Sequence, residues 1–361
     1  MPADQTQAVR FAHRMAVIEP FQVMALLGRA RTLEAEGRSI IHMEIGEPDL
    51  PTPTPILNAA RRALDEHPQH YTPTPGLPAL REAIAQFYAD RHGVQLDPRR
   101  ILITPGASGA LLLALGVLLN PGEGVLLADP GYPCYRHFGH FLNGIAQPVA
   151  VSAADHYQLN AAALQAHWRE ESVAALLASP SNPTGTVIGE AELAAMQRLV
   201  RTRGGWLLVD EIYHGLIYED PPNTALAMSD DLFVINSFSK YFSMTGWRLG
   251  WLVAPEAYIE PIERLLQNLF IAAPTLSQYA ALAALQPATL ALLEERRAIF
   301  RQRRDWLLPA LRDLDLPIPV TPQGAFYLYA DCSAWSHDST QLSRDLLEQA
   351  GVAVTPGLDF G

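Results

Sequence analysis

From about residue 100 onward, the sequence alternates short, almost continuous apolar runs with longer stretches of helical periodicity. Runs that are apolar along their whole length are typical of strands buried on both faces of a sheet. Strands separated by helices usually pair in parallel, and the helices cover the sheet. We therefore predict an α/β fold around a mainly parallel sheet. The predicted strands are 101–103, 125–128, 173–178, 206–209, 233–235 and 249–254.

Helical periodicity is clearest at residues 77–91, where apolar side chains recur every three or four positions. Pro78 falls in the first turn of this segment, where its missing N–H group has no cost. After Pro255 the pattern changes to long helices, one of which is Arg-rich and lies around residues 294–313. This change of texture indicates a second structural unit.

A chain of 361 residues, 49% of them hydrophobic, is long enough to bury the cores of two domains. We expect a larger domain at residues 46–254. A smaller domain would combine residues 1–45 with residues 255–361. Two apolar runs in its second part, 325–329 and 352–354, suggest a small sheet.

Charge and cysteine content exclude several classes of protein. The balance of 26 Lys and Arg against 38 Asp and Glu gives a net charge of −12, so we expect no nucleic-acid partner. Two cysteines, Cys134 and Cys332, cannot form a disulfide framework and fit a reducing compartment. No window approaches the uncharged length of a membrane span, and the N-terminus lacks an apolar signal region. We therefore expect a cytoplasmic protein without a membrane partner.

Several well-known motifs are absent. Residues 106–110, GASGA, bring the second glycine one place too early for a G-x-S-x-G nucleophile motif. A Walker lysine and a G-x-G-x-x-G fingerprint are also missing. His137 and His140 could share a helix face, but without a third ligand they are better interpreted as packing or surface histidines. We expect no metal site.

Lys240 stands out because lysine is rare in this sequence. It follows the predicted strand 233–235 within the polar segment SFSKYFSMTGWRLG, which also contains Arg248. Partial desolvation and a nearby cation would both lower the pKa of the Lys240 amine and leave it nucleophilic. An ordinary solvated surface lysine is the alternative interpretation.

Asp210 ends the apolar run WLLV, where a buried charge without a partner would be unfavourable. A protonated pyridine nitrogen would satisfy it, since sites for pyridoxal 5'-phosphate (PLP) combine a Schiff-base lysine with a carboxylate at the ring nitrogen. The alternative is that Asp210 caps the N-terminus of a following helix.

An anion site is indicated at Gly106, Ala107 and Ser108, which connect a predicted strand to the helical run at 110–119. Backbone N–H groups at the start of that helix, together with the Ser108 hydroxyl, could bind a phosphate group. Arg248 and Ser237 could supply further donors. A glycine-rich turn capped by serine is the alternative.

Seven segments, in the same order along nearly the whole chain, resemble the class I/II aminotransferase family of fold-type I PLP enzymes. Any one of them is weak, but seven in order are specific. They are IGEPDLPTP (45–53), YTPTPGLPALREAIA (71–85), TPGASGAL (104–111), DPGYPCY (129–135), SPSNPTG (179–185), DEIYHGLIYE (210–219) and SFSKYFSMTGWRLGW (237–251).

The resemblance implies catalytic roles for the matching residues. Lys240 would form the Schiff base and later move the proton between the substrate Cα and the cofactor C4′. Asp210 would keep the pyridine nitrogen protonated. Tyr213 and Asn182 would donate to the phenolate oxygen of the ring, and Tyr132 would stack on its face.

The resemblance also implies binding roles. Tyr71 would reach the phosphate of a neighbouring subunit, which implies a homodimer with shared active sites. The backbone of Gly46 would approach the substrate carboxylate, and Asn182 would contact the substrate as well. The residues at phosphate-binding positions are Ala107, Ser108, Ser237 and Arg248.

For the fold, the family implies a mainly parallel seven-stranded sheet in the large domain, a smaller α/β domain, and cis peptides before Pro130 and Pro183. One departure concerns the arginine that clamps the substrate carboxylate. In the family it follows a P-G-x-x-F-G motif, and here the sequence ends on that motif at residues 356–361. We expect a further C-terminal segment to carry it, and without it amino-acid binding is in doubt.

The resulting prediction is a PLP-dependent aminotransferase that moves an amino group from an L-amino acid to a 2-oxo acid. A PLP lyase, either β-eliminating or ring-forming, is the alternative on the same fold. A second alternative is a catalytically silent binding or regulatory module, such as the effector half of a transcription factor. Such a protein would need an attached DNA-binding domain, and the roughly 40 residues before the GEPD motif contain no basic recognition helix.

Overall fold

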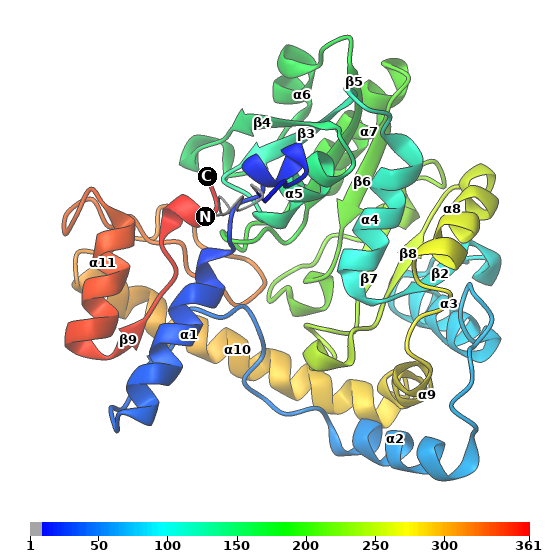
Figure 1. Cartoon of the computed structure of the whole chain (residues 1–361), viewed down its shortest axis with the longest axis horizontal. Helices are drawn as coiled ribbons and strands as arrows, with labels where there is room; N and C mark the ends of the chain where they lie inside the picture. Colours follow the sequence, from blue (N-terminus) through cyan, green and yellow to red (C-terminus); the bar gives the residue numbers. More distant parts are fainter. Residues whose placement is uncertain (1–8) are drawn as a thin grey trace, which may run out of the picture.

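The computed structural model of this chain describes residues 9–361. Its central feature is a seven-stranded sheet with the order β2-β8-β7-β6-β5-β3-β4 (Figure 1). Strand β8 is antiparallel to both of its neighbours, and the other pairs are parallel. The predicted α/β fold with a mainly parallel seven-stranded sheet is therefore confirmed. The strands are β2 Ile101–Thr104, β3 Gly124–Asp129, β4 Ile145–Ala150, β5 Ser172–Ala178, β6 Trp206–Asp210, β7 Phe233–Ser237 and β8 Gly250–Val253.

Both faces of the sheet are buried, because successive side chains of each strand enter two different hydrophobic clusters. In β3, Val125 and Leu127 pack on the side of α4, whereas Leu126 packs on the side of α3 and α7. This burial explains why the strands are apolar along their whole length. The helices are α1 Gln22–Ala35, α2 Thr54–Glu66, α3 Pro78–His92, α4 Gly106–Leu118, α5 Cys134–Phe141, α6 Ala161–His167, α7 Glu190–Thr202, α8 Glu256–Leu269, α9 Thr275–Ala284, α10 Pro287–Asp313 and α11 Ser339–Asp345.

Strand β4 was not among the predicted strands. It lies at the edge of the sheet and pairs with β3 alone. Its side chains alternate between exposed and buried positions, and it contains Pro148. Proline is tolerated in an edge strand, where its missing N–H group breaks no central hydrogen bond. The strand therefore lacks the continuous apolar run that identifies the others.

The prediction of the small sheet is confirmed for the run 352–354, which contains a strand, and wrong for the run 325–329. The small sheet consists of β1, Ile41–His42, and β9, Val352–Ala353, which pair in parallel. The run 325–329 forms no strand, and the neighbouring Gly324 makes only an isolated bridge to Ile217. The aromatic residues of that run pack against other side chains, Phe326 against Phe300 and Tyr327 against Tyr213, and do not pair with a strand. A strand-like composition was therefore misleading here.

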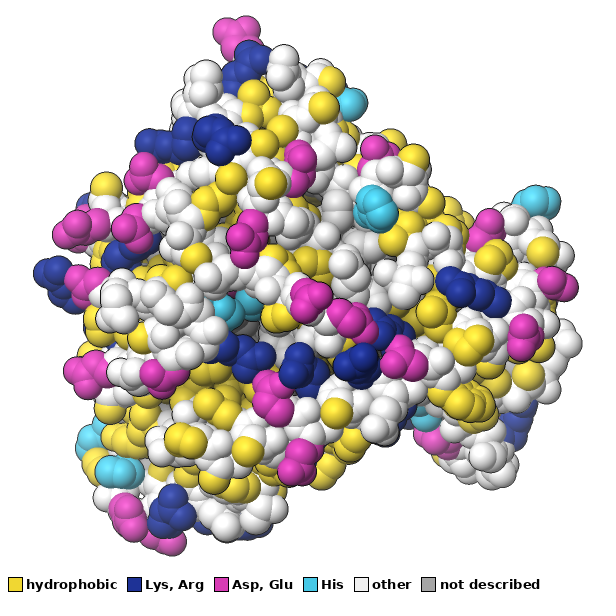
Figure 2. Space-filling view, turned by 180° about the vertical axis from the view of Figure 1, so that it is seen from behind, with side chains coloured by type: hydrophobic (Ala, Val, Ile, Leu, Met, Phe, Trp, Pro, Cys, Tyr) yellow, Lys and Arg dark blue, Asp and Glu magenta, His cyan; other side chains and the backbone are white. Residues whose placement is uncertain are grey.

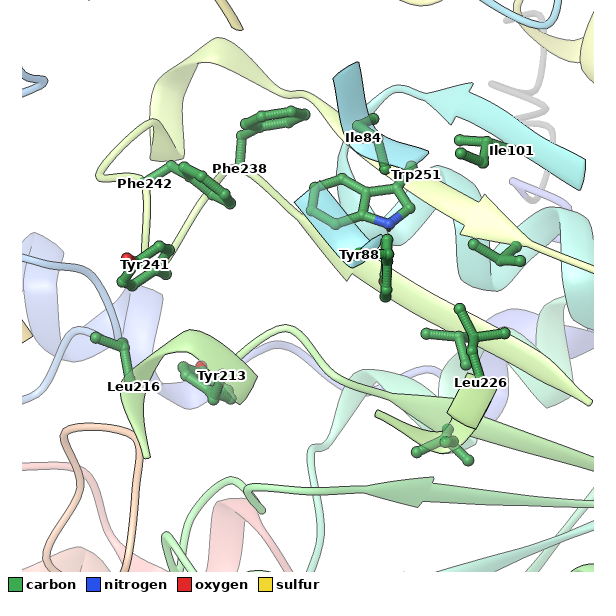
Figure 3. Close-up of a cluster of buried hydrophobic side chains, with 14 of the residues drawn as sticks. Ile84, Tyr88, Ile101, Tyr213, Leu216, Leu226, Phe238, Tyr241, Phe242 and Trp251 are labelled. Carbon is green, nitrogen blue, oxygen red and sulfur yellow. Dashed lines mark hydrogen bonds between the residues drawn. The ribbon is translucent and has the colours of Figure 1, made fainter. Parts of the chain in front are cut away.

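An aromatic cluster on the α3 side of the sheet supports the segment that follows β7 (Figure 3). Trp251 of β8 donates a hydrogen bond from Nε1 to the Tyr88 hydroxyl at 3.2 Å. Its ring packs against that of Phe238, with 5.0 Å between centroids, and Phe238 packs against Phe242. All four side chains are buried. The loop between Phe238 and Phe242 therefore rests on a rigid base.

Charged side chains are mixed on the surface. On the face drawn in Figure 2, basic and acidic side chains are interspersed and form no extensive patch of one sign. Within residues 9–361, no individual helix is both long and apolar enough to cross a membrane, and only the pair α9 and α10, bent by 80°, passes on length and composition.

Candidate active site

The carboxyl ends of the central strands bring the predicted residues to one edge of the sheet. Asp210 is the last residue of β6 and is paired with Ala178, the last residue of β5. Lys240 follows the end of β7 by three residues. Because β8 runs antiparallel, Arg248, which lies just before it, reaches the same edge. Ligands of open α/β sheets bind at such edges.

Lys240 is the sole lysine of the 361 residues. Its Nζ donates a hydrogen bond to the carbonyl oxygen of Gly46 and lies 5.8 Å from the ring centroid of Tyr213 and 6.0 Å from that of Phe326. The pKa of the Lys240 amine is lowered to about 8, first by burial and also by Arg248, while Glu47 and Asp210 oppose this shift. The expected nucleophilic amine is therefore supported by its surroundings.

Asp210 is only 3% exposed. The Tyr135 hydroxyl donates to its Oδ2 at 2.7 Å, and the backbone N–H of Ile212 donates to its Oδ1 at 3.0 Å. Burial raises the pKa of the Asp210 carboxyl to about 6, and these two hydrogen bonds limit the rise. No α-helix begins here, since a single 3₁₀ turn, His214–Leu216, follows. Asp210 thus caps a turn and is not the N-cap of a helix.

The predicted anion site lies at the first turn of α4, which begins at Gly106 itself. A Cβ added to Gly106 would lie 2.6 Å from Nη2 of Arg248, so the guanidinium occupies the space over this helix end. Ala107 is buried, and Ser108 is exposed. Ser237 is buried, and its hydroxyl lies 2.9 Å from the Leu249 carbonyl oxygen and accepts from the Ser239 N–H group. Arg248, Gly106, Ala107 and Ser108 are therefore brought together at this end of α4.

Tyr213, Asn182 and Tyr132 come from three different strand ends. The Tyr213 hydroxyl forms a hydrogen bond with that of Tyr327, and burial raises the Tyr213 pKa well above its usual value. The Asn182 Oδ1 is buried without a hydrogen-bond partner among the described residues. Tyr132 packs edge to face against Tyr135, the partner of Asp210, with 5.2 Å between centroids.

Gly46 approaches the site through its backbone. Its carbonyl oxygen accepts from Lys240, and a Cβ added here would lie 2.5 Å from the Tyr327 hydroxyl. A side chain at position 46 would therefore displace Tyr327. Tyr71, in contrast, makes no hydrogen bond to the other predicted residues within the described chain, and its side chain is 79% exposed. Its proposed role toward a neighbouring subunit stays a prediction.

The two cis peptides expected at this edge are confirmed. The peptides before Pro130 and Pro183 are cis, and a third cis peptide, before Pro180, was not predicted. No group of three or more His, Cys, Asp and Glu side chains within residues 9–361 could hold a metal ion.

Sequence reasoning missed two residues of the site, Tyr135 and Tyr327. Tyr135 lies within the motif DPGYPCY, but nothing local in the sequence links it to Asp210, which is 75 positions away. Tyr327 was assigned to a strand, whereas its hydroxyl meets that of Tyr213. The roles of these two tyrosines depend on which segments lie side by side in the folded protein, and no local sequence pattern indicates them.

The arrangement fits pyridoxal phosphate on three observations. A buried carboxylate, Asp210, has no cationic hydrogen-bond partner in the described chain, and a protonated ring nitrogen would supply one. The amine of Lys240, whose pKa is lowered to about 8, can react with the aldehyde of the cofactor. The guanidinium of Arg248 over the first turn of α4 forms a cradle for a phosphate group. The amine, the acid and the cradle thus match the three polar parts of this cofactor.

Comparisons with known proteins agree with this arrangement. The family described as "Aminotransferase class I and II" matches residues 38–361. A valine–pyruvate aminotransferase of Mycobacterium tuberculosis is 38% identical over 347 residues, covering 96% of this chain and 89% of that protein. A (5-formylfuran-3-yl)methyl phosphate transaminase of Methanocaldococcus jannaschii is 36% identical over 351 residues, covering 96% and 90%. The solved aspartate aminotransferase of Thermus thermophilus with maleate superimposes with a TM-score of 0.92 at 32% identity, covering 98% of this chain and 92% of that one.

The fold and the site together define a PLP-dependent enzyme of the aspartate aminotransferase type. The chain belongs to the class I and II aminotransferase family, and its activity is the transfer of amino groups between amino acids and oxo acids, which are small molecules.

Proposed function

We propose that this chain transfers the amino group of an L-amino acid to a 2-oxo acid with Lys240 as the residue that both binds the cofactor aldehyde as a Schiff base and moves the Cα proton. The observation that carries this proposal is the environment of the sole lysine, which is partly buried beside Gly46, Tyr213 and Phe326. A lysine held there with a lowered pKa can act first as a nucleophile and then as a general base.

Asp210 provides the electrostatic part of the proposal. When bound, pyridoxal phosphate supplies a conjugated ring that accepts the electron pair left by a broken Cα–H bond. The Asp210 carboxylate would hold the proton on the ring nitrogen, which makes the ring a better acceptor. Tyr135 fixes one of its oxygens, and a pKa of about 6 keeps the carboxyl mostly ionised at neutral pH.

The remaining predicted residues would orient the ring and the substrate. Tyr213, protonated because burial raises its pKa, can donate to the phenolate oxygen, and the Nδ2 group of Asn182 can donate beside it. Tyr132 would cover one face of the ring. Gly46 and Asn182 would contact the substrate carboxylate. Side chains held at the ends of different strands are positioned before the ring binds, which is the arrangement that these roles require.

Cofactor capture should depend on pH through Lys240. With a pKa of about 8, roughly a quarter of the amine is unprotonated at pH 7.5, compared with about 0.1% for an ordinary lysine. The rate at which cofactor-free protein binds PLP should therefore rise with pH and level off above pH 8. Stopped-flow absorbance from pH 6.5 to 10 measures this rate, with N-acetyl-lysine amide as the control. A rate that still rises steeply at pH 10 would show that the amine is solvated.

The test of the reaction itself is amino transfer to a 2-oxo acid. Purified, PLP-loaded protein should convert amino acids to 2-oxo acids over many turnovers only while a second 2-oxo acid is present, because the amino group taken from the first substrate must be delivered to an acceptor before the site can react again. A panel of amino acids with 2-oxoglutarate and pyruvate as acceptors covers the substrate class. Release of ammonia or a ring-closed product without an acceptor would favour the lyase instead.

Three further features are proposed. We infer a homodimer, supported by the exposure of Tyr71, and sedimentation that finds only monomers at micromolar concentration would refute it. We infer a division into residues 46–254 and residues 1–45 with 255–361, which limited proteolysis can test by cleavage near residues 46 and 255. We infer a cytoplasmic location, which cell fractionation would overturn by finding the protein elsewhere.

A further inference from the structure

Tyr241, the residue after Lys240, faces away from the active site and is buried against the backbone of the Tyr213 turn. A Cβ added to Gly215 would lie 2.4 Å from Cγ of Tyr241, so the tyrosine ring rests directly on this glycine. The guanidinium of Arg91, from α3, covers the ring at 5.1 Å from its centroid. The side chain that follows the lysine is thus held between Arg91 and the turn after Asp210.

Glu294 of α10 forms a hydrogen bond with Tyr241. The Tyr241 hydroxyl donates to Glu294 Oε1 at 2.6 Å, and Arg91 Nη1 donates to the same oxygen at 3.0 Å. Burial raises the pKa of Tyr241, so its hydroxyl remains a donor. Although burial opposes ionisation of Glu294, its pKa lies below its usual value because Tyr241, Arg91 and Arg297 stabilise the carboxylate. A charged acceptor therefore meets a neutral donor, which makes a strong hydrogen bond.

The Glu294 carboxylate is also linked to the segment that carries Asp210 and Tyr213. Its Oε2 lies 2.6 Å from Nη2 of Arg297, one turn further along α10. Nη1 of Arg297 donates to the carbonyl oxygen of Ile217 at 2.7 Å, and Ile217 directly follows the 3₁₀ turn after Tyr213. One residue of α10 thus contacts both the segment that carries Lys240 and, through Arg297, the segment that carries Asp210 and Tyr213.

We propose that Glu294 is a positioning residue for amino transfer: from α10 it fixes Tyr241, and through Tyr241 the direction in which Lys240 enters the active site. This inference rests on the proposed function of Lys240. The segment is short and tightly turned, since the Ser243 N–H group donates to the Lys240 carbonyl oxygen at 3.0 Å. A shift of Tyr241 would therefore move the neighbouring lysine.

Removal of the carboxylate should impair turnover more than binding. Glu294→Ala is expected to lower kcat by about tenfold or more, because small displacements of a proton-transferring group are costly, and to change KM by less than about twofold, because Glu294 does not touch the substrate. Glu294→Gln keeps an oxygen for Tyr241 and should recover part of the loss. Glu295→Ala is the matched control, since it removes an exposed glutamate from the next position of the same helix.

A second measurement requires neither cofactor nor substrate. Hydrogen exchange of cofactor-free protein should show a faster-exchanging Ser243 amide in Glu294→Ala than in Glu295→Ala. If Glu294→Ala does not fold, Tyr241→Phe, which removes only the hydroxyl, should show the same two changes to a smaller extent. A double-mutant cycle of Tyr241→Phe and Glu294→Gln should give losses that do not add.

The outcomes separate this inference from the function on which it rests. If wild-type protein transfers amino groups and Glu294→Ala or, where that does not fold, Tyr241→Phe matches Glu295→Ala in kcat and in Ser243 exchange, the positioning role is wrong and the function stands. If wild-type protein transfers no amino group, the proposed function fails and the positioning role fails with it.

Discussion

Replacing Lys240 by alanine should abolish amino transfer, with kcat reduced on the order of 10³-fold or more, because the variant loses both the nucleophile and the general base. Lys240 is the only lysine among these 361 residues, so no other lysine side chain within them can substitute for it. The protein should still fold, because deleting a partly charged buried group removes a desolvation penalty. Amino-transfer assays at saturating PLP, with circular dichroism to check folding, measure both effects.

Lys240→Arg is the matched variant for this experiment. Arginine keeps the positive charge and most of the length, but its guanidinium is not a nucleophile at neutral pH. It should be as inactive as the alanine variant, which would show that an amine and not a cation is needed. Turnover within tenfold of wild type in either variant would mean that Lys240 does not carry the reaction.

Replacing Asp210 by asparagine should lower kcat by about 10²-fold or more while the protein stays folded. Asparagine preserves the size of the side chain and an oxygen for the Tyr135 hydroxyl, but it cannot stabilise a proton on the ring nitrogen. The loss of one preorganised charge at a reacting group is typically of this magnitude. Asp210→Ala should be at least as impaired. Steady-state kinetics with the amino acid that wild-type protein uses best would measure the loss.

The neighbouring Glu211 offers a control for this acid. It is equally buried, but its carboxylate accepts hydrogen bonds from the Thr224 hydroxyl and the Ala225 N–H group, both within the chain. Glu211→Gln should therefore reduce thermal stability and leave kcat within a few-fold of wild type. If the Asp210 and Glu211 variants lost turnover equally, the effect would reflect burial of an acid and not a role at the ring.

Sequence reasoning found the residues whose place follows from strand order. Arg248 precedes its strand and reaches the site because β8 is antiparallel. Lys240 and Asp210, in contrast, lie at the carboxyl ends of apolar runs, and the carboxyl ends of neighbouring parallel strands meet at one edge of a sheet. Their meeting could therefore be predicted once the parallel arrangement was recognised. Tyr135 and Glu294 could not be found in this way, because their partners are 75 and 53 positions away and no local spacing connects them.

Errors arose where the local pattern and the tertiary environment disagree. Strand β4 contains Gln147 and Pro148, and its side chains alternate between exposed and buried positions because it lies at an edge, so it lacks the signal of a buried strand. Residues 325–329 have the composition of a strand, but Phe326 packs against Phe300 and Tyr327 against Tyr213. The aromatic residues of this run are therefore explained by side-chain packing and not by pairing in a sheet.

The most direct test of the central claim is to find the amine that captures the cofactor. PLP-loaded protein would be reduced with borohydride, digested and analysed by mass spectrometry. Because Lys240 is the sole lysine of the 361 residues, no other side-chain amine among them competes with it. We expect one phosphopyridoxyl group per chain, on the peptide that contains Lys240. A label confined to the N-terminus, or none at all, would contradict this account.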